Sequence, residues 1–269
     1  MDIVIVAANV PHGAFQGALS GLGAPELGAC AIRAALAQAG MTGEQVNEVY
    51  MGNVLSAGVG QAPARQAALK GGLPDSVPCT TINKVCGSGM KAVMLAADSL
   101  RLGEAEVVVA GGMESMSRAP YLLDKARSGF RMGHQSVLDH MFLDGLQDAY
   151  EGHLMGHYAQ LSADRSGLTR ADMDAFAIAS LERALTAQRS GAFAAELAPV
   201  MAADHTLLLA DDEQPGKARP DKIPGLKPAF SKHGTITAAN ASSISDGAAA
   251  LVLMRGETAA GSDCRCWPG

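Results

Sequence analysis

The sequence is poor in charged and aromatic residues. Of its 269 residues only 18% are charged and 4% aromatic, with a single tryptophan, whereas 48% are hydrophobic. A disordered chain shows the opposite balance, with much charge and few apolar residues. At roughly 150 residues per domain, the length allows about two domains or one large one, with a sizeable core. The composition therefore predicts a globular chain packed with small residues.

Three further features are absent, and each excludes a class of protein. Asp and Glu outnumber Lys and Arg by 27 to 21, so the chain has no basic footprint for nucleic acid. No apolar run reaches the length of about 18 residues that a membrane span needs. The apolar start at residues 3–6 lacks the basic segment of a signal peptide and predicts a first strand. We therefore expect neither nucleic acid nor membrane as a partner.

Cysteines are few, odd in number and irregularly spaced. They are Cys30, Cys79, Cys86, Cys264 and Cys266. This pattern argues against a disulfide framework and predicts a cytoplasmic protein in a reducing compartment. We expect no metal site, because His153 and His157 lack an intervening glutamate and a lone C-x-C pair cannot supply four zinc ligands. The histidines at positions 134, 140, 153 and 157 are predicted to lie in loops or at the surface.

Strand-like and helix-like segments alternate through the first part of the chain. Strands are expected at residues 2–8, 46–55, 78–83 and 107–110, and helices at 25–39, 63–70 and 90–102. The apolar positions Met90, Val93, Met94, Ala97 and Leu100 predict the buried face of the last of these helices. This alternation is typical of a layered α/β sheet.

The alternation stops after Ser117 and returns at Gly234. Between them, residues 169–189 form the strongest helical pattern, with an apolar stripe running from Met173 to Leu185. Residues 211–228 are charged, hold four prolines and are expected to be loop. We therefore expect a core of residues 1–117 and 234–254, interrupted by an insertion at 118–233.

Cys86 is the residue that local context marks for chemistry. It lies at the end of a predicted strand, where a glycine-rich turn opens a helix. A helix N-terminus favours the thiolate over the thiol, and Gly87 and Gly89 permit a tight turn with close approach of a substrate. The backbone N–H of Cys86 can help to hold an oxyanion. A buried structural thiol is the alternative, and local context alone leaves both open.

Three motifs in order resemble those of the thiolase family. They are NKVCGSGMKA at residues 83–92, AGGMESMS at 110–117, and NAS at 240–242 followed by DGAAA at 246–250. The resemblance covers residues 1–254 and is closest to the acetyl-CoA acetyltransferases. It implies a thiolase-like α/β fold, present as one layered αβα half with an inserted loop domain. It also implies an acyltransferase.

The resemblance implies covalent catalysis through an acyl-cysteine at Cys86. The substrates would be acetyl-CoA or a 3-ketoacyl-CoA, in Claisen condensation or thiolysis, without a permanently bound cofactor. Relatives are dimers or tetramers, so a homo-oligomer is expected. The family's coenzyme A contacts map to Leu146, Met155, Arg219, Phe230, Ala238 and Ser242. Without the resemblance, the apolar members of this set would be assigned to the core and Arg219 to a solvated loop.

The sequence departs from the family after Met254. Thiolases continue into a second, similar half that brings a histidine in a His-Pro motif and a second cysteine, and none of the seven histidines here precedes proline. Residues 255–269 have a divergent character, which suggests a frameshift or premature stop that sequencing of the locus tests. Impaired catalysis is the expectation, because a general base normally lies within hydrogen-bond reach of the nucleophile.

Two alternatives remain open at this point. One is a catalytically inactive remnant that binds coenzyme A weakly or pairs with a full-length subunit. The other is a relative of the β-ketoacyl synthases, which share the fold and a cysteine nucleophile. The GGMESM run and the long insertion favour a thiolase.

Overall fold

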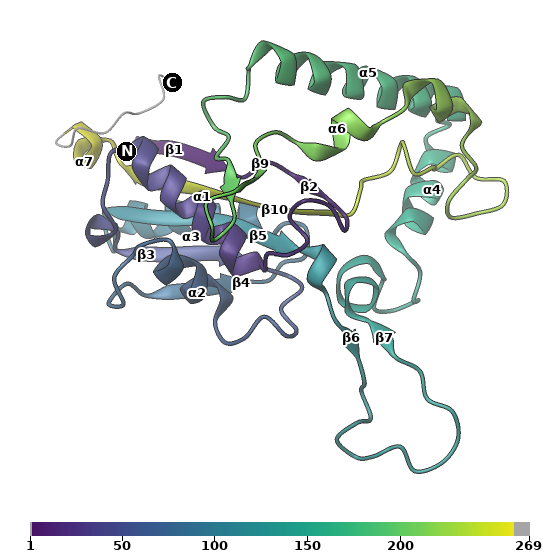
Figure 1. Cartoon of the computed structure of the whole chain (residues 1–269), viewed down its shortest axis with the longest axis horizontal. Coiled ribbons are helices and arrows are strands. Elements are labelled where there is room, and N and C mark those ends of the chain that lie inside the picture. Colours follow the sequence, from purple (N-terminus) through teal and green to yellow (C-terminus); the bar gives the residue numbers. More distant parts are fainter. Residues whose placement is uncertain (1, 261–269) are drawn as a thin grey trace.

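A six-stranded mixed sheet forms the centre of the molecule, as a computed structural model that describes residues 2–260 shows (Figure 1). Five strands follow one another in the order β1 (Ile3–Asn9), β10 (Ser245–Arg255), β5 (Val107–Ser115), β3 (Glu48–Gly52) and β4 (Cys79–Ile82), and the short β2 (Gly13–Ala14) pairs with β10. Strand β10 is antiparallel to both β1 and β5, whereas β3 is parallel to β5 and β4. The last long strand of the chain therefore lies between the first strand and β5.

Helices cover both faces of this sheet. Helices α1 (Ala24–Ala39) and α2 (Pro63–Lys70) contribute to one apolar cluster, and α3 (Ser88–Leu102) contributes to a second one on the opposite side. The short elements η1 (Gly43–Gln45) and α7 (Gly256–Ala260) lie at the periphery. This αβα arrangement confirms the predicted α/β class, and most of the expected strands and helices of the first 117 residues are present.

Local sequence explains where the helices begin and end. Helix α1 has Pro25 in its first turn, where the missing N–H is not needed, and stops at Gly40, whose φ of 67° is left-handed. Helix α3 stops in the same way at Gly103. Alanines make up much of the buried surface of α1, so this helix lies close against the sheet.

The predicted buried face of α3 is correct at Leu100 and wrong at the two methionines. The residues that α3 buries are Ser88, Ala92, Ala96, Ser99 and Leu100. Met90 is 74% exposed and Met94 is also exposed. The small residues Ala92 and Ala96 bring the helix axis close to the sheet, so this face buries more backbone than the methionine face would. Hydrophobic periodicity does not identify this buried face of α3, because it gives large side chains more weight than alanine and serine.

Residues 116–244 wrap around one end of the sheet. In chain order they form η2 (Met116–Arg118), β6 (Tyr121–Leu122), β7 (Leu138–Asp139), η3 (Phe142–Leu146), α4 (Met155–Arg165), α5 (Arg170–Ser190), β8 (Val200–Met201), β9 (Leu207–Leu209), α6 (Glu213–Lys217) and η4 (Pro220–Gly225). Between β6 and β7 a long loop extends away from the body (Figure 1). The loop expected at 211–228 instead contains α6 and η4, in which Pro220 stands at the start of η4, where the missing N–H is tolerated.

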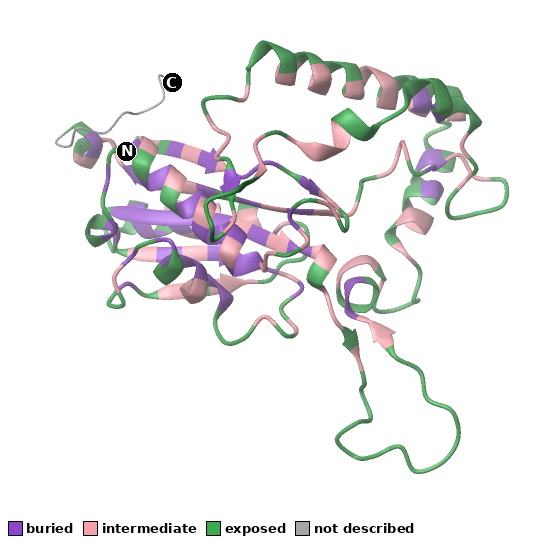
Figure 2. Ribbon diagram, in the orientation of Figure 1, coloured by how far each residue is buried: buried purple, intermediate pink, exposed green. Residues whose placement is uncertain are grey.

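Helix α5 is as long as expected but not buried as expected. Thr169 and Asp172 form the predicted capping box, and Gly191 ends the helix. Of its residues only Asp174 is buried, and Phe176 of the predicted apolar stripe is 73% exposed. Figure 2 shows the contrast between this mostly exposed helix and the buried sheet. The stripe therefore lines the edges of cavities instead of a core.

Three consecutive side chains tie the 116–244 segment to the sheet. The carboxylate of Asp212 accepts a hydrogen bond from the backbone N–H of His12, and that of Glu213 accepts one from Ala14. The amide of Gln214 donates to Ile244 O and Ser245 Oγ. This clasp, residues 212–214, fixes the loop after β1 relative to the start of β10.

The division into a core and an insertion at 118–233 remains a proposal. The C-x-C pair Cys264–Cys266 and residues 261–269 of the divergent tail lie outside the described residues. In the described part of the chain, no helix combines the length and apolar character that a membrane crossing requires.

Candidate active site

Cys86 is presented at the tip of a tight turn between β4 and α3. It is exposed and directly precedes Gly87, the N-cap of α3. The backbone N–H groups of Gly87 and Ser88 donate to the carbonyls of Lys84 and Val85, which closes the turn. The glycine at position 52 allows the Cys86 turn to lie this close to β3, because a Cβ at Gly52 would lie only 2.7 Å from Ser88 Cβ. The predicted strand–turn–helix setting of Cys86 is present.

The turn holds a strained residue beside the cysteine. Val85 has a φ of 48°, a left-handed conformation that a β-branched residue rarely adopts. Ser88 Oγ accepts a hydrogen bond from Lys84 N (2.8 Å) and donates to Val85 O (2.6 Å). Asn83 Oδ1 accepts from Val85 N (3.0 Å). Strain of this kind concentrates at functional sites, where surrounding hydrogen bonds maintain it.

A cavity of about 430 Å³ opens beside Cys86. Its walls come from the turn at residues 52–55, the Cys86 turn, the end of β5, the end of η3 and the start of β10. Leu146 of η3 and His12 from the loop after β1 reach the same cavity. Glycines at positions 52, 89, 112, 145 and 247 leave much of this wall as bare backbone. A flat or branched thioester can therefore approach the sulfur closely.

Glu114 lies in the wall of this cavity at the end of β5. Its carboxylate accepts hydrogen bonds from Asn53 Nδ2 (2.8 Å), Val54 N (2.9 Å) and Leu55 N (3.1 Å). Burial raises its pKa above the ordinary value of 4.5, although the N–H groups of Val54 and Leu55 act in the opposite direction. Glu114 thus fixes the 53–57 turn to the sheet.

The raised pKa of Glu114 predicts how the free energy of unfolding depends on pH. Its folded pKa lies above the unfolded value, so the protonated group stabilises the fold at low pH. That contribution is lost as pH rises through the folded pKa. Urea unfolding of wild type and Glu114→Gln between about pH 4 and pH 7 checks this. We expect the free energy of unfolding of wild type, minus that of the variant, to fall as pH rises. A difference that grows with pH contradicts it.

The structure distributes the six predicted coenzyme A contacts over several places. Leu146 shares the cavity of Cys86. Arg219 and Ala238 line a cavity of about 680 Å³ beneath α5, and Ser242 lines one of about 560 Å³ beside the same helix. The ring of Phe230 covers Gly156, the neighbour of Met155. His12 belongs to both the Cys86 cavity and the cavity of Arg219 and Ala238.

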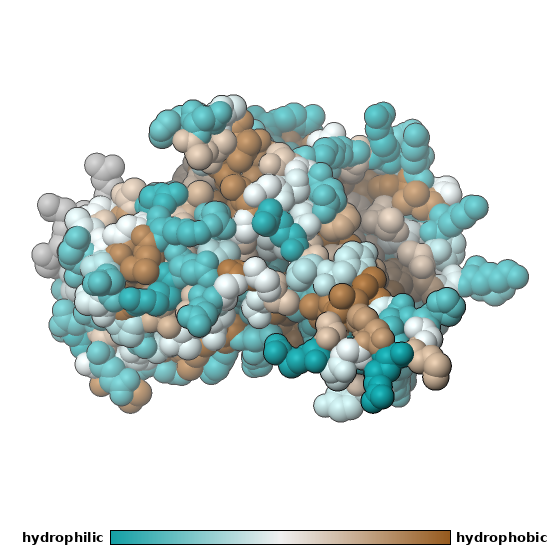
Figure 3. All heavy atoms as spheres, turned by 60° about the horizontal axis from the view of Figure 1, so that its bottom comes forward, coloured by the Kyte–Doolittle hydropathy of each residue, from teal (hydrophilic) through white to brown (hydrophobic). Residues whose placement is uncertain are grey.

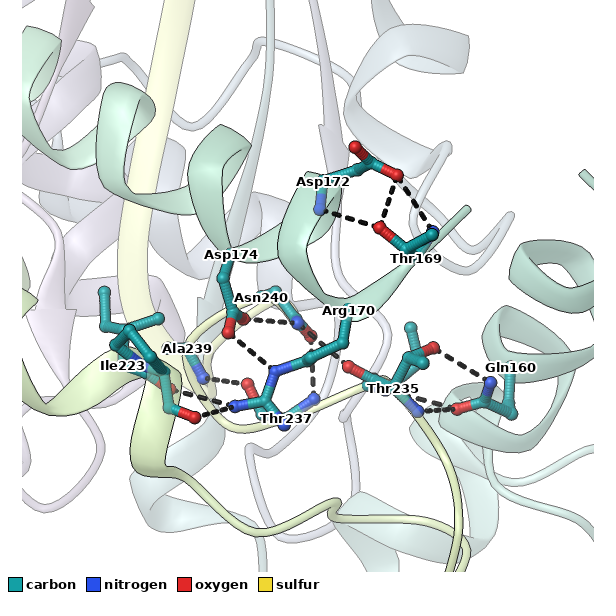
Figure 4. A network of polar contacts seen from close by, with 12 residues as sticks. Gln160, Thr169, Arg170, Asp172, Asp174, Ile223, Thr235, Thr237, Ala239 and Asn240 are labelled. Atoms are coloured by element: carbon teal, nitrogen blue, oxygen red, sulfur yellow. Dashed lines mark hydrogen bonds and ion pairs between the residues drawn. The ribbon is translucent and has the colours of Figure 1, made fainter. Parts of the chain in front are cut away.

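A polar network holds the segment that carries Ala238 and Ser242 (Figure 4). Buried Asp174 on α5 accepts hydrogen bonds from Arg170 Nε (2.7 Å) and from Asn240 Nδ2 (3.1 Å). Asn240 Oδ1 accepts one from Thr237 N (2.7 Å). Arg170 also donates to Ile223 O in η4 (2.9 Å), so one ion pair fixes α5, η4 and the 235–240 segment together.

Sequence reasoning missed three polar side chains of this region. Glu114 stood inside a recognised motif without a role, and His12 was not singled out. The prediction that His140 lies in a loop or at the surface is wrong as to the surface, because this residue, which lies between β7 and η3, is only 5% exposed. Its partners come from separate parts of the chain, so no local pattern marks it. A titratable residue between short apolar runs was the only available signal.

Apolar side chains also reach the surface of the molecule. Figure 3 shows them as separate brown clusters among hydrophilic residues on the face drawn. Met90, Met94 and Leu102 of α3, together with Val85 beside Cys86, are exposed. The Cys86 turn and the outer face of α3 therefore share an apolar character.

Comparison with known proteins agrees with the motifs. The family model described as thiolase, N-terminal domain, matches residues 3–257. The acetyl-CoA acetyltransferase of Cupriavidus necator is 52% identical over 258 residues, which are 94% of this chain and 66% of that protein. Acetyl-CoA acetyltransferase 2 of Arabidopsis thaliana is 52% identical over 264 residues, 96% of this chain and 66% of that protein. The chain thus spans about two thirds of the length of these relatives.

A solved structure shows the same fold. It is the crystal structure of the Acat5 thiolase from Ascaris suum in complex with coenzyme A. The TM-score is 0.93 at 39% sequence identity, over 99% of this chain and 69% of that one. The sheet order, the helix layers and the segment that wraps around the end of the sheet are therefore those of a solved protein.

Proposed function

The chain belongs to the thiolase family, and from this we propose that it is an acyltransferase that takes the acyl group of a coenzyme A thioester onto Cys86. The observation that carries the proposal is the strained, exposed Cys86 turn at the mouth of a glycine-lined cavity. Membership of the family favours this function over that of a β-ketoacyl synthase. It also supports coenzyme A thioesters as substrates, with no permanently bound cofactor.

The reaction is a transfer between two thiols. The sulfur of Cys86 attacks the carbonyl carbon of the thioester, and the carbon–sulfur bond to coenzyme A breaks. The Cys86 proton passes to the coenzyme A sulfur, so one thioester and one thiol exist before and after the step. The N-terminus of α3 supplies positive potential where the carbonyl oxygen gains charge. Because the products resemble the reactants, the step is close to neutral in free energy.

We assign the remainder of the coenzyme A to the residues that the motifs mark. Leu146 contributes apolar surface in the Cys86 cavity, and Arg219 supplies a cation for the phosphate end. Met155, Phe230, Ala238 and Ser242 complete the proposed contacts of the pantetheine arm and the adenine. The connection through His12 between two of the cavities supports a continuous path from Arg219 to Cys86.

The finer part of the proposal concerns the second half-reaction. Within the described residues, Cys86 is the one cysteine in its cavity and His12 is the one histidine. We propose that this chain by itself carries out acyl transfer to Cys86 and is impaired in condensation or thiolysis, which need a further acid or base. A homo-oligomer, either a dimer or a tetramer, is the proposed assembly. The alternative is an inactive remnant that binds coenzyme A weakly or pairs with a full-length subunit.

Incubation with acetyl-CoA tests the proposal. We expect one acetyl group on the peptide that contains Cys86, found by mass spectrometry, and an equal amount of free coenzyme A. An unmodified Cys86 that still reacts with iodoacetamide would overturn the acyltransferase function. Sustained production of acetoacetyl-CoA by the same sample would overturn the proposed impairment.

A further inference from the structure

His140 connects two parts of the Cys86 cavity wall. One part is the turn at residues 53–57, of which 53–55 line the cavity and Ala57 lies just outside it. The other is η3, a π-helical turn in which Gln147 N donates to Phe142 O (2.8 Å). The two parts touch directly, because a Cβ on Gly145 would lie 3.2 Å from Leu55 Cδ2. Leu55, Gly145 and Leu146 all line the cavity. π-Helical turns are rare and are frequent at functional sites.

The hydrogen bonds of His140 define its tautomer. The backbone N–H of Ala57 donates to His140 Nε2 (3.3 Å), so this nitrogen carries no proton. Nδ1 lies 2.5 Å from Asp144 Oδ2 and therefore donates its proton there. The backbone N–H of His140 donates to Pro120 O (3.1 Å), which anchors the residue to the segment after η2. The ring thus joins the 53–57 turn to η3 by an acceptor on one side and a donor on the other.

Glu114 supports the same turn from the opposite direction. It holds the N–H groups of Val54 and Leu55, whereas His140 holds that of Ala57. The turn therefore has its position set by one side chain from the sheet and one from the wrapping segment. If the bond to His140 is lost, the N–H of Ala57 loses its partner and the link to η3 opens. The Glu114 bonds fix Val54 and Leu55 to the sheet and make no link to η3.

We propose that His140 is a positioning residue for acyl transfer, one that shapes the cavity wall around the thioester by holding the 53–57 turn against η3. This inference rests on the proposed function of Cys86. The imidazole of His140 makes its hydrogen bonds to Ala57 and Asp144, not to the sulfur of Cys86. It therefore acts on the site through these two residues. Its loss should weaken the fit of the thioester and leave the reactivity of Cys86 itself unchanged.

Two substitutions separate the two hydrogen bonds. In histidine Nδ1 is two bonds from Cβ and Nε2 is three, as are the amide atoms of asparagine and glutamine respectively. His140→Gln therefore keeps an acceptor for Ala57, whereas His140→Asn keeps a donor for Asp144 and leaves Ala57 N–H unpaired. Ala57 is half-buried, and a donor left unpaired there is costly. We therefore expect His140→Asn to raise the half-saturating concentration of acetyl-CoA by about tenfold. His140→Gln should stay within about threefold of wild type.

The test measures Cys86 acylation against acetyl-CoA concentration in wild type and both variants. The maximal rate and the rate of Cys86 alkylation by iodoacetamide should be similar in all three proteins. Amide exchange at Ala57 is followed in parallel and should accelerate in His140→Asn only. Equal exchange in all three proteins would overturn the positioning role, whether or not acetyl-CoA acylates Cys86. An equal half-saturating concentration in wild type and His140→Asn would overturn it as well. Failure of wild type to become acylated refutes the proposed function separately.

Discussion

Replacement of Cys86 by alanine is expected to abolish the transfer of an acetyl group from acetyl-CoA to the protein. Alanine lacks the sulfur that forms the new thioester, and the change removes no hydrogen bond that holds the turn. The rate of protein acylation should fall by about a hundredfold or more. Quantitative mass spectrometry of the intact protein measures the effect.

Cys79 offers a matched control on the neighbouring strand. Burial raises the pKa of its thiol, although Arg65 acts in the opposite direction. A thiol that stays protonated is a weak nucleophile, so Cys79→Ala should be acylated at the wild-type rate. If acylation persisted in Cys86→Ala and vanished in Cys79→Ala, the nucleophile would be Cys79, and the assignment of Cys86 would be refuted.

Gly111→Ala is expected to cost more stability than other conservative changes in the sheet. A Cβ at this position would overlap the carbonyl oxygen of Ala249 on β10, which is backbone and cannot rotate away. The central β5–β10 pair must then separate, and we expect a loss of about 3 kcal/mol or more in the free energy of unfolding. Urea denaturation followed by circular dichroism checks the value.

Gly112→Ala is the control, one residue along the same strand. A Cβ there would lie 3.4 Å from Gly89 Cα and make an ordinary contact. We expect a change below about 1 kcal/mol. Equal losses at the two positions would contradict the prediction, because only Gly111 approaches the backbone of β10 closely. The two adjacent glycines of one motif therefore serve different purposes.

The sequence predicted the strands and helices of the sheet well because their signals are local. Pro25 and Gly40 mark the ends of α1 without any knowledge of its neighbours. The burial of Met90 and Met94 on α3 and of the apolar stripe on α5 was predicted wrongly, because burial depends on what lies opposite. Small residues on α3 face the sheet, and α5 spans cavities where its apolar stripe has no core to enter. Periodicity identifies an apolar face but not the surface that receives it.

The same difference between local and distant signals applies to the residues of the site. Cys86 could be found from its turn, because a strand, two glycines and a helix start are all encoded within a few residues. His140 could not, because Pro120, Ala57 and Asp144 define its surroundings and two of them lie far away in the chain. The predicted coenzyme A contacts came from motif resemblance, and their roles stay predictions.

The position of β10 has a consequence for synthesis on the ribosome. β1 is complete once Asn9 is made, but its sheet partner begins only at Ser245. Until then β1 and one edge of β5 have unpaired backbone groups that can join other strands. Pairings this distant in sequence form slowly, and the exposed edges favour aggregation. The nascent chain should therefore depend on chaperones until its last long strand emerges and joins the two edges.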